Sequence, residues 1–279
     1  MLLPIRHSIF IFLIILPAFS IHAEQPNSWI IYNGADILPE AFRDYDMMVM
    51  DGKNHIALRA LLAWDKTILA RVSLGQIHES DPDFQQVKDA NILIAPSSDK
   101  PGFWFVDIRQ DFWPKLILEQ IIPEILHDRF TGLMLDSLEQ IMGFEQNNPK
   151  YKGLSLSAVH LIQAIRMHYS TMLMINCACD LIHDIAPYAD MIVGESLFSF
   201  YDPKTKTYQL QPNQSYKIRI QKMREIQKTN PHIGLYSLDY WNPDDLSMIE
   251  KIVEEEKKSG VIPYVGNFQL DHVKIQTTP

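Results

Sequence analysis

Eight short apolar segments that alternate with helical or irregular stretches predict an α/β protein of the (β/α)8 TIM-barrel class, folded as a single domain. This alternation indicates parallel strands joined by crossovers. Eight units spread over about 240 residues match the size of such a barrel. A hydrophobic content of 47% in 279 residues supplies one large core. The alternative is an open doubly wound sheet, but no glycine-rich phosphate loop follows the first strand to support it.

The first three predicted strands lie at 29–32, 45–50 and 67–74, and each is an apolar run that ends at a polar residue or glycine. A short helical piece at 39–43 and a helix at 55–64 separate them. Asp81-Pro82 then predicts a helix start, because a capping residue precedes a proline in the first turn. A loop over 96–102, a short extra strand over 104–108 and a helix over 114–127 follow. Pro123 is expected to kink or divide that helix.

The remaining five strands are predicted at 132–135, 171–175, 190–193, 233–238 and 261–265. Helices are expected at 156–169, 181–188 and 216–228 from apolar residues at helical spacing. The run Asn242-Pro243-Asp244-Asp245 predicts the start of a last helix, which Gly260 ends. Between strand six and the next helix, residues 198–212 form a loop rich in aromatic residues.

Each predicted strand is followed by an amide or an acid. In a barrel these positions converge at the carboxyl ends of the strands, which we call the mouth and where barrel enzymes build their sites. A single residue of this kind is weak evidence, since Asx residues favour turns and helix caps. For Asp136, capping of the next helix is the open alternative. The eight residues are Asn33, Asp51, Gln76, Asp136, Asn176, Glu195, Asp239 and Asn267.

A mouth of carboxylates and amides suits the binding of sugar hydroxyls and the cleavage of glycosidic bonds, which needs two carboxyl groups. Other chemistries find less support. No serine lies in a G-x-S-x-G context, and the ten histidines show no metal-ligand spacing. We therefore expect no metal and no cofactor. Cys177 and Cys179 are too close on a strand for an unstrained disulfide, and we interpret them as small apolar residues.

Residues 1–23 have the three-part pattern of a signal peptide, with Arg6, an apolar run over 9–19 and a small residue at Ala23. An uncleaved membrane anchor is the alternative. With 1–23 removed, residues 24–279 form the barrel domain and carry 24 basic against 34 acidic residues, a net charge of −10. This charge argues against nucleic acid or anionic membranes as partners. We expect a secreted or periplasmic protein without a stable membrane span.

Several short motifs, in this order along the chain, resemble glycoside hydrolase family 114. They are Ser73-Leu74-Gly75-Gln76, Val106-Asp107-Ile108-Arg109 with Trp113, Gly132-Leu133-Met134-Leu135-Asp136, Val193-Gly194-Glu195-Ser196, Leu238-Asp239-Tyr240 and Pro263-Tyr264-Val265. This is the family of endo-α-1,4-polygalactosaminidase-like barrels, related to the hydrolase domain of the Pel polysaccharide pathway. The resemblance covers nearly all of the chain after residue 23.

The resemblance implies a (β/α)8 barrel that cleaves a galactosamine-rich exopolysaccharide internally, with Asp136 and Glu195 as the catalytic carboxylates. It also shows one departure, since Gln76 stands where the family often has a glutamate, and an amide cannot exchange a proton at neutral pH. The alternative function is a non-catalytic barrel that binds exopolysaccharide during export or retention. We expect the substrate, a partly cationic amino-sugar polymer, to contact Tyr32, Asp51, Gln76, Asn176, Asp239, Tyr240, Trp241, Tyr264 and Asn267.

For the surplus acids and for the aromatic residues, the sequence also allows roles other than substrate binding. Asp51 and Asp239 are surplus to the two carboxyls that hydrolysis needs, so they favour a cationic ligand, yet each is equally suited to capping a helix or binding neutral hydroxyls. The aromatic residues are suited to stacking on sugar rings, but also to ordinary packing in the core or at its rim.

Overall fold

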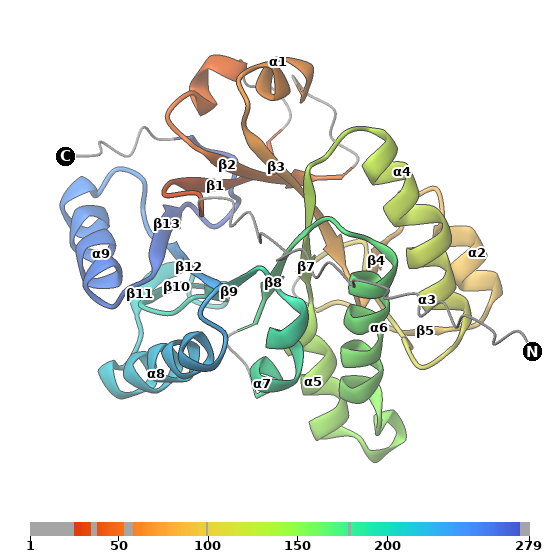
Figure 1. Ribbon diagram of the computed structural model, residues 1–279. Coiled ribbons are helices and arrows are strands. Elements are labelled where there is room, and N and C mark those ends of the chain that lie inside the picture. The colour runs from red at the N-terminus through yellow and green to blue at the C-terminus, as the bar shows by residue number, and fades with distance from the viewer. Residues whose placement is uncertain (1–24, 35–37, 53–57, 99, 178–179, 274–279) are drawn as a thin grey trace, which may run out of the picture.

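Eight parallel strands form a nearly closed barrel with the helices outside it (Figure 1). The computed structural model describes residues 25–34, 38–52, 58–98, 100–177 and 180–273. The barrel prediction and all eight predicted strands are confirmed. In sheet order the strands are β1 (Trp29–Tyr32), β2 (Met47–Asp51), β3 (Thr67–Ser73), β7 (Gly132–Asp136), β8 (Met172–Asn176), β9 (Met191–Glu195), β12 (Gly234–Tyr240) and β13 (Ile262–Gly266).

Most of the barrel strands are buried on both faces and therefore consist largely of apolar residues. Met47 to Met50 of β2 and Leu133 to Leu135 of β7 are all buried. The first and last strands meet at the seam, where the Trp29 indole donates a hydrogen bond to the carbonyl of Ile262 at 3.1 Å. Just beyond β1, the amide of Asn33 donates to the carbonyl of Leu270 at 2.7 Å.

The helices cover the outside of this barrel. Pro123 interrupts its helix as predicted, since a π-helical turn at Ile117–Ile121 separates α3 from α4, which has this proline in its first turn. The α-helices are α1 (Leu58–Ala63), α2 (Phe84–Asp89), α3 (Phe112–Leu116), α4 (Ile122–His127), α5 (Leu138–Asn147), α6 (Leu154–His168), α7 (Ile182–Ile185), α8 (Asn213–Thr229) and α9 (Leu246–Lys258).

The sequence did not predict two excursions at the mouth. After β3 the chain forms a three-stranded antiparallel sheet from β4 (Gln76–His78), β5 (Leu93–Pro96) and β6 (Phe103–Val106), of which only the last was expected. After β9 it forms the hairpin of β10 (Ser199–Asp202) and β11 (Thr207–Leu210), in the stretch expected to be an aromatic loop. The hairpin strands β10 and β11 are largely half-exposed and lack the apolar runs that mark the barrel strands, whereas β5 and β6 are short apolar runs that are only partly buried.

One prediction about the cysteines is wrong. Cys177 is disulfide-bonded, whereas we expected a free apolar residue. Cys177 lies beyond the last residue of β8, so the strand geometry behind that expectation does not apply to it. Cys179 and the N-terminal segment 1–23 lie outside the described residues. None of the helices in the described ranges has the length and apolar character that a membrane span requires.

Candidate active site

Asp136 is the last residue of β7, so the strand delivers its carboxyl to the mouth. Its Oδ1 accepts hydrogen bonds from the Ser137 amide at 2.6 Å and from Asn176 Nδ2 at 3.1 Å. Its Oδ2 lies 4.0 Å from Arg71 Nε, and both side chains are partly buried. Ser137 adopts a left-handed conformation with φ of 77°, which turns the chain sharply from β7 into α5. Asp136 therefore faces donors and a cation, an arrangement that stabilises negative charge.

Glu195 occupies the equivalent position at the end of β9. Its Oε2 accepts a hydrogen bond from Asn176 Nδ2 at 2.6 Å, and its Oε1 accepts one from the Tyr240 hydroxyl at 2.5 Å. The following residue, Ser196, has φ of 54° and makes the same kind of sharp turn as Ser137. Both oxygens of this carboxyl are thus held by donors from the two neighbouring strands.

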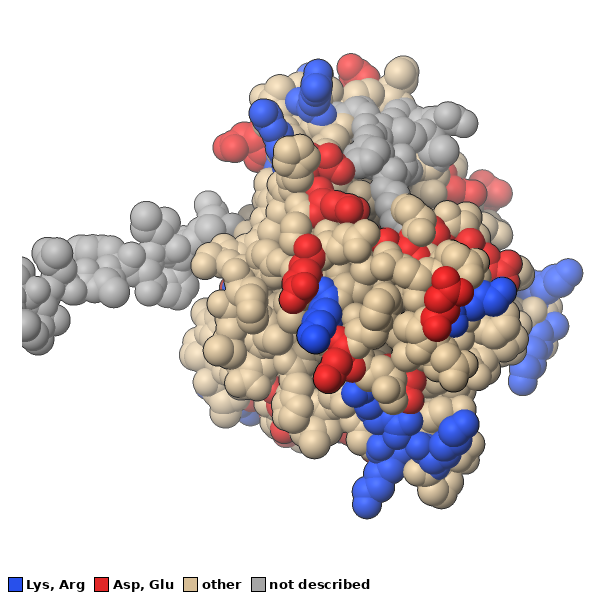
Figure 2. Space-filling view, turned by 90° about the vertical axis from the view of Figure 1, so that its right-hand side faces the viewer, with Lys and Arg blue, Asp and Glu red and all other residues tan. Residues whose placement is uncertain are grey.

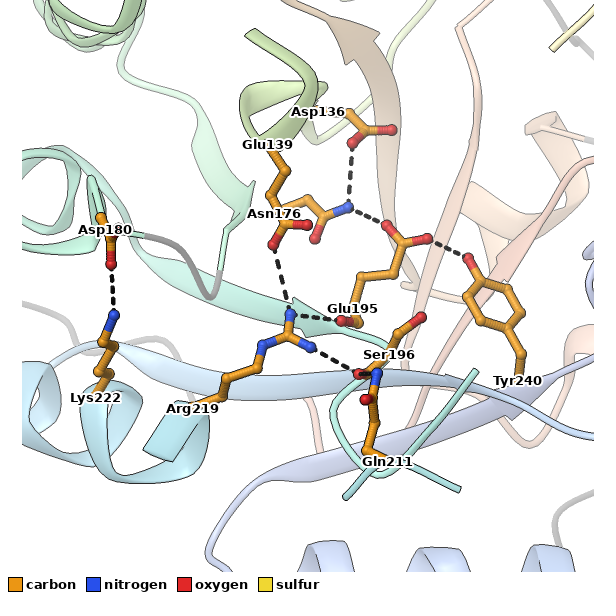
Figure 3. Close-up of polar contacts among 10 residues, drawn as sticks. All are labelled: Asp136, Glu139, Asn176, Asp180, Glu195, Ser196, Gln211, Arg219, Lys222 and Tyr240. Atoms are coloured by element: carbon orange, nitrogen blue, oxygen red, sulfur yellow. Dashed lines mark hydrogen bonds and ion pairs between the residues drawn. The ribbon is translucent and has the colours of Figure 1, made fainter. Parts of the chain in front are cut away.

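Asn176 at the end of β8 bridges the two acids, because one side-chain nitrogen donates to both of them (Figure 3). The separation of Asp136 Oδ1 and Glu195 Oε2 cannot exceed the sum of 3.1 Å and 2.6 Å, which is below about 6 Å. The two carboxyls of a retaining glycosidase lie about 5–5.5 Å apart, and those of an inverting enzyme about 6.5–9.5 Å. The arrangement is closer to the retaining geometry.

Tyr240 is the last residue of β12 and is buried beside Glu195. Burial raises its pKa well above the ordinary value, and the neighbouring charge of Glu195 raises it further. The phenol therefore stays protonated at neutral pH. A hydroxyl can donate or accept, so Tyr240 can hydrogen-bond Glu195 in either protonation state.

Two residues that the sequence did not indicate complete this group. Arg219 reaches in from α8, and its Nη1 and Nη2 donate to the carbonyls of Ser196 at 2.7 Å and Glu195 at 2.8 Å. Its Nη2 also lies 3.5 Å from Glu139 Oε1 in the first turn of α5 (Figure 3). The pKa of Glu139 is raised by desolvation and by the carboxylates of Glu195 and Asp136, while Arg219 lowers it.

On the other side of Asp136, a cleft of about 470 Å³ opens over the ends of β2 and β3. Asp51, Arg71 and Gln76 contribute to its walls. Gln76 is buried and accepts a long hydrogen bond of 3.5 Å from Ser137 Oγ. Because Arg71 lies in this cleft and also 4.0 Å from Asp136, the cleft extends to the neighbourhood of Asp136.

The other predicted site residues lie elsewhere. Asp239 is completely buried, and its Oδ1 accepts from the amides of Phe198 and Ser199 at 2.8 and 2.6 Å. The predicted strand ended at Leu238, whereas β12 continues to Tyr240. Since side chains alternate along a strand, Asp239 points away from the mouth when Tyr240 points into it. We therefore no longer regard Asp239 as a substrate ligand.

Four further residues have structural contacts of their own. Tyr264 packs in the core against Trp29 and Tyr45, and Tyr32 packs against Phe42. The Asn267 side chain binds Asp271 within its own turn at 2.6 Å. The Trp241 indole donates to Asp245, the cap of α9, at 3.1 Å. Only Trp241 and Asn267 of these four keep a partly exposed side chain.

Within the described residues, neither a metal-binding cluster nor the larger groove outside the barrel adds to the site around Asp136 and Glu195. The described part of the chain holds no group of three or more His, Cys, Asp or Glu side chains placed to bind a metal ion. A larger groove of about 990 Å³ lies outside the barrel between α8 and α9. Its basic lining residues are exposed lysines and an exposed arginine, and neither Asp136 nor Glu195 contributes to it.

The contacts of Arg219 predict a positioning role. In Arg219→Ala, the carbonyls of Glu195 and Ser196 lose their charged donor, so we expect kcat to fall about tenfold with KM little changed, an effect of about 1.4 kcal/mol. The matched control is Lys222→Ala on the same helix, which removes only an ion pair with the exposed Asp180. Steady-state kinetics of both variants check this. A rise in KM with kcat unchanged for Arg219→Ala would indicate a binding role instead.

Comparison with known proteins supports the family and the fold. The model of the glycoside-hydrolase family GH114 matches residues 19–278. The glycoside hydrolase domain of PelA from Pseudomonas aeruginosa superposes with a TM-score of 0.77 at 16% identity, covering 90% of this chain and 98% of that one. Ega3 from Aspergillus fumigatus, solved in complex with galactosamine, gives a TM-score of 0.63 at 14% identity, covering 88% and 92%. At these identities the likeness shows the fold. No curated protein matches the chain.

Proposed function

The chain belongs to glycoside-hydrolase family GH114, and from this we propose that it cleaves a galactosamine-containing polysaccharide internally, with Asp136 and Glu195 as the catalytic pair. The observation that carries the proposal is the bridging of both carboxyls by Asn176 at the mouth of the barrel. If Asp136 only capped the next helix, it would not need a second acid beside it. Two acids held within reach of one sugar ring meet the requirement of glycoside hydrolysis.

In the proposed mechanism, Asp136 is the nucleophile, because Arg71 and two N–H donors stabilise its negative charge. Its carboxylate attacks the anomeric carbon while protonated Glu195 gives its proton to the departing glycosidic oxygen. A covalent glycosyl–enzyme forms. Glu195, now ionised, takes a proton from water, and the resulting hydroxide oxygen attacks the anomeric carbon and releases Asp136. Two displacements leave the anomeric configuration retained.

Residues 1–23 direct export, and the enzyme acts outside the cytoplasm, where a polymeric substrate is available. Arg6, the apolar run 9–19 and Ala23 support this part of the proposal. The N-terminal sequence of the protein recovered from outside the cytoplasm tests it. A chain that still begins at Met1 and stays with the membrane would favour the uncleaved anchor.

Product analysis tests the central proposal. Wild-type protein incubated with polygalactosamine, acetylated or not, is expected to release a ladder of oligomers and not only monosaccharide, and NMR of the first products should show the retained anomer. The control protein carries Asp136→Asn and Glu195→Gln together. If wild type releases no new reducing ends from these polymers but binds them as well as the control does, the non-catalytic barrel is the better description.

The substrate of this proposal is at least partly cationic. Asp51 is exposed at the end of β2 in the cleft, and Glu139 adds a second carboxylate beyond the catalytic pair. Asp51 and Glu139 are the surplus carboxylates of this proposal in place of Asp51 and Asp239, because Asp239 is buried. The whole chain carries a formal charge of −9. On the face that carries α2 and α4, the acidic side chains are interspersed with basic ones (Figure 2), so we attribute attraction of ammonium groups to the mouth and not to that surface.

Salt dependence tests this charge complementarity. In an Asp136→Asn background, binding of a de-acetylated oligomer is expected to weaken about three- to tenfold between 0.1 M and 1 M salt, because the Debye length falls from about 10 Å to about 3 Å. The acetylated oligomer is the control and should change little. Calorimetric titrations at both salt concentrations measure this. Tighter, salt-insensitive binding of the acetylated oligomer would replace the cationic ligand with a neutral one.

A further inference from the structure

The mouth carries aromatic rings over the strands β9, β12 and β13, and the proposed mechanism does not use most of them. Tyr201 of β10 and Tyr208 of β11 are directly opposite each other in the hairpin register, so they share one face, with ring centroids 5.0 Å apart. The hairpin follows β9 directly, so it stands next to the strand that ends in Glu195.

Rings from two other loops join this pair. Phe268, just after β13, stacks on Tyr201 with centroids 4.3 Å apart and an angle of 24°. Its amide also donates to the Tyr208 hydroxyl at 3.3 Å. Trp241, just after β12, lies 6.1 Å from Tyr208. We call these four residues, Tyr201, Tyr208, Trp241 and Phe268, the aromatic ledge.

The aromatic ledge is continuous with the catalytic pair. The Phe268 ring lies 6.2 Å from the ring of Tyr240, and the Tyr240 hydroxyl is 2.5 Å from Glu195 Oε1. One ring therefore separates the ledge from the carboxyl that faces the glycosidic oxygen in our mechanism. Phe268 is 41% exposed. Its ring adjoins those of Tyr201 and Tyr240, so its exposed part extends a contiguous aromatic surface and does not stand alone.

We infer that the aromatic ledge is a remote sugar subsite, which binds pyranose rings of the polymer beyond the bond that is cleaved. The inference rests on the proposed function. A pyranose presents an apolar C–H face and a polar rim, and rings with polar tips, as in tyrosine and tryptophan, match both. The cleft with Asp51 lies on the opposite side of Asp136, so a long chain can cross the mouth with the catalytic pair between the cleft and the ledge.

This arrangement explains internal cleavage. A polymer bound at the ledge and in the cleft must place a middle bond at Asp136 and Glu195. A short oligomer reaches only one region and loses the stacking contribution. The subsite should therefore increase kcat/KM for long substrates and leave short ones nearly unaffected, since binding energy from remote sugars is available only when those sugars are present.

Ring removal tests the subsite. We expect Phe268→Ala to lower kcat/KM for the polymer about tenfold, with the rate on a substrate that only spans the cleaved bond kept within about twofold. Tyr201→Ala should act in the same way. Phe112→Ala is the matched control, because Phe112 is a similarly exposed phenylalanine, at 37%, on α3. Equal losses on short and long substrates would overturn the inference, and so would no loss on either.

A binding measurement separates this inference from the proposed function. In the Asp136→Asn background, Phe268→Ala should weaken binding of a long amino-sugar oligomer about tenfold by calorimetry, whether or not wild type cleaves it. If wild type cleaves nothing but this loss is seen, the ledge stands and the hydrolase proposal falls. If wild type cleaves the polymer and Phe268→Ala binds it unchanged, the ledge falls and the hydrolase stands.

Discussion

Asp136→Asn and Glu195→Gln should each lower kcat on the polymer by at least about 10³-fold, since each removes a group that forms or breaks a bond in the transition state. Both are nearly isosteric changes at partly buried positions, so we expect the barrel to remain folded and to keep most of its polymer binding. The matched control is Asp180→Asn, an acid-to-amide change at an exposed residue that pairs with Lys222 outside the site.

The two variants should differ in a way that assigns their roles. Glu195→Gln lacks the proton donor, so a substrate whose leaving group needs no proton should recover much of its first-step rate. Asp136→Asn lacks the nucleophile, so no such recovery is expected. The measurement is the rate of leaving-group release for activated and unactivated substrates in both proteins. Recovery in Asp136→Asn alone would reverse the assignment, and activity within tenfold of wild type in both would reject the pair.

The barrel was predictable because its strands are buried on both faces and therefore stand out as apolar runs. The hairpin after β9 was not predictable in this way, because a half-exposed strand such as β11 carries no such run. Helix α5 was also missed. Gly143 weakens its intrinsic helix propensity. It forms because Leu138 and Ile141 pack into the core, a tertiary contribution that the local sequence does not reveal.

The positions of Asp136 and Glu195 at the mouth were predictable for the same reason as the strands, since each residue ends an apolar run. The error at Asp239 came from ending the strand at Leu238, whereas β12 continues to Tyr240, and Asp239 alternates with Tyr240 inside it and faces away from the mouth. Arg71 could have been identified from the sequence as a candidate site residue, because a charged residue inside a buried strand is rare. Arg219 could not be identified in this way. It lies on an outer helix, and only the folded chain brings it to the carbonyl of Glu195.

The second large effect is on stability and involves Asp239, the acid that we expected at the mouth and that is buried instead. Asp239 and Glu256 of α9 are both completely buried between barrel and helices. Within the described ranges, Asp239 Oδ2, both carboxyl oxygens of Glu256 and Ser237 Oγ have no hydrogen-bond partner. Burial raises the pKa of Asp239 to about 7, although the Ser199 and Phe198 amides lower it. Burial, and then the charge of Asp239, raise the pKa of Glu256 to about 8.

A raised pKa in the folded protein makes stability fall as pH rises. Below about pH 4 both acids are protonated in the folded and unfolded chain, so they impose no cost. Between about pH 4 and the folded pKa values of about 7 and about 8, the unfolded chain has released protons that the folded protein still holds. The free energy of unfolding therefore declines across this window and levels off above it. Arg219 reduces the effect on both groups.

We expect Glu256→Gln to remove the larger share of this decline. The amide has no charge to bury, so the variant should gain about 2–4 kcal/mol over wild type between pH 5 and pH 8, measured as the change in the difference of their unfolding free energies. Urea denaturation at both pH values checks this. The control is Glu255→Gln on the same helix, where the side chain is 43% exposed and pairs with Lys258.

Parallel stability curves for wild type and Glu256→Gln would mean that the pair is not protonated in the folded state and that some other contact compensates its charge. If the two curves instead diverge as pH rises, as we expect, there is a consequence for the site. Asp239 holds the amides of Phe198 and Ser199, just after the turn that follows Glu195, and its strand neighbour Tyr240 donates to Glu195. An ionised, repelling pair behind that turn would loosen the residues that hold the catalytic acid. The alkaline loss of wild-type activity should then be shifted to higher pH in Glu256→Gln, in parallel with its stability.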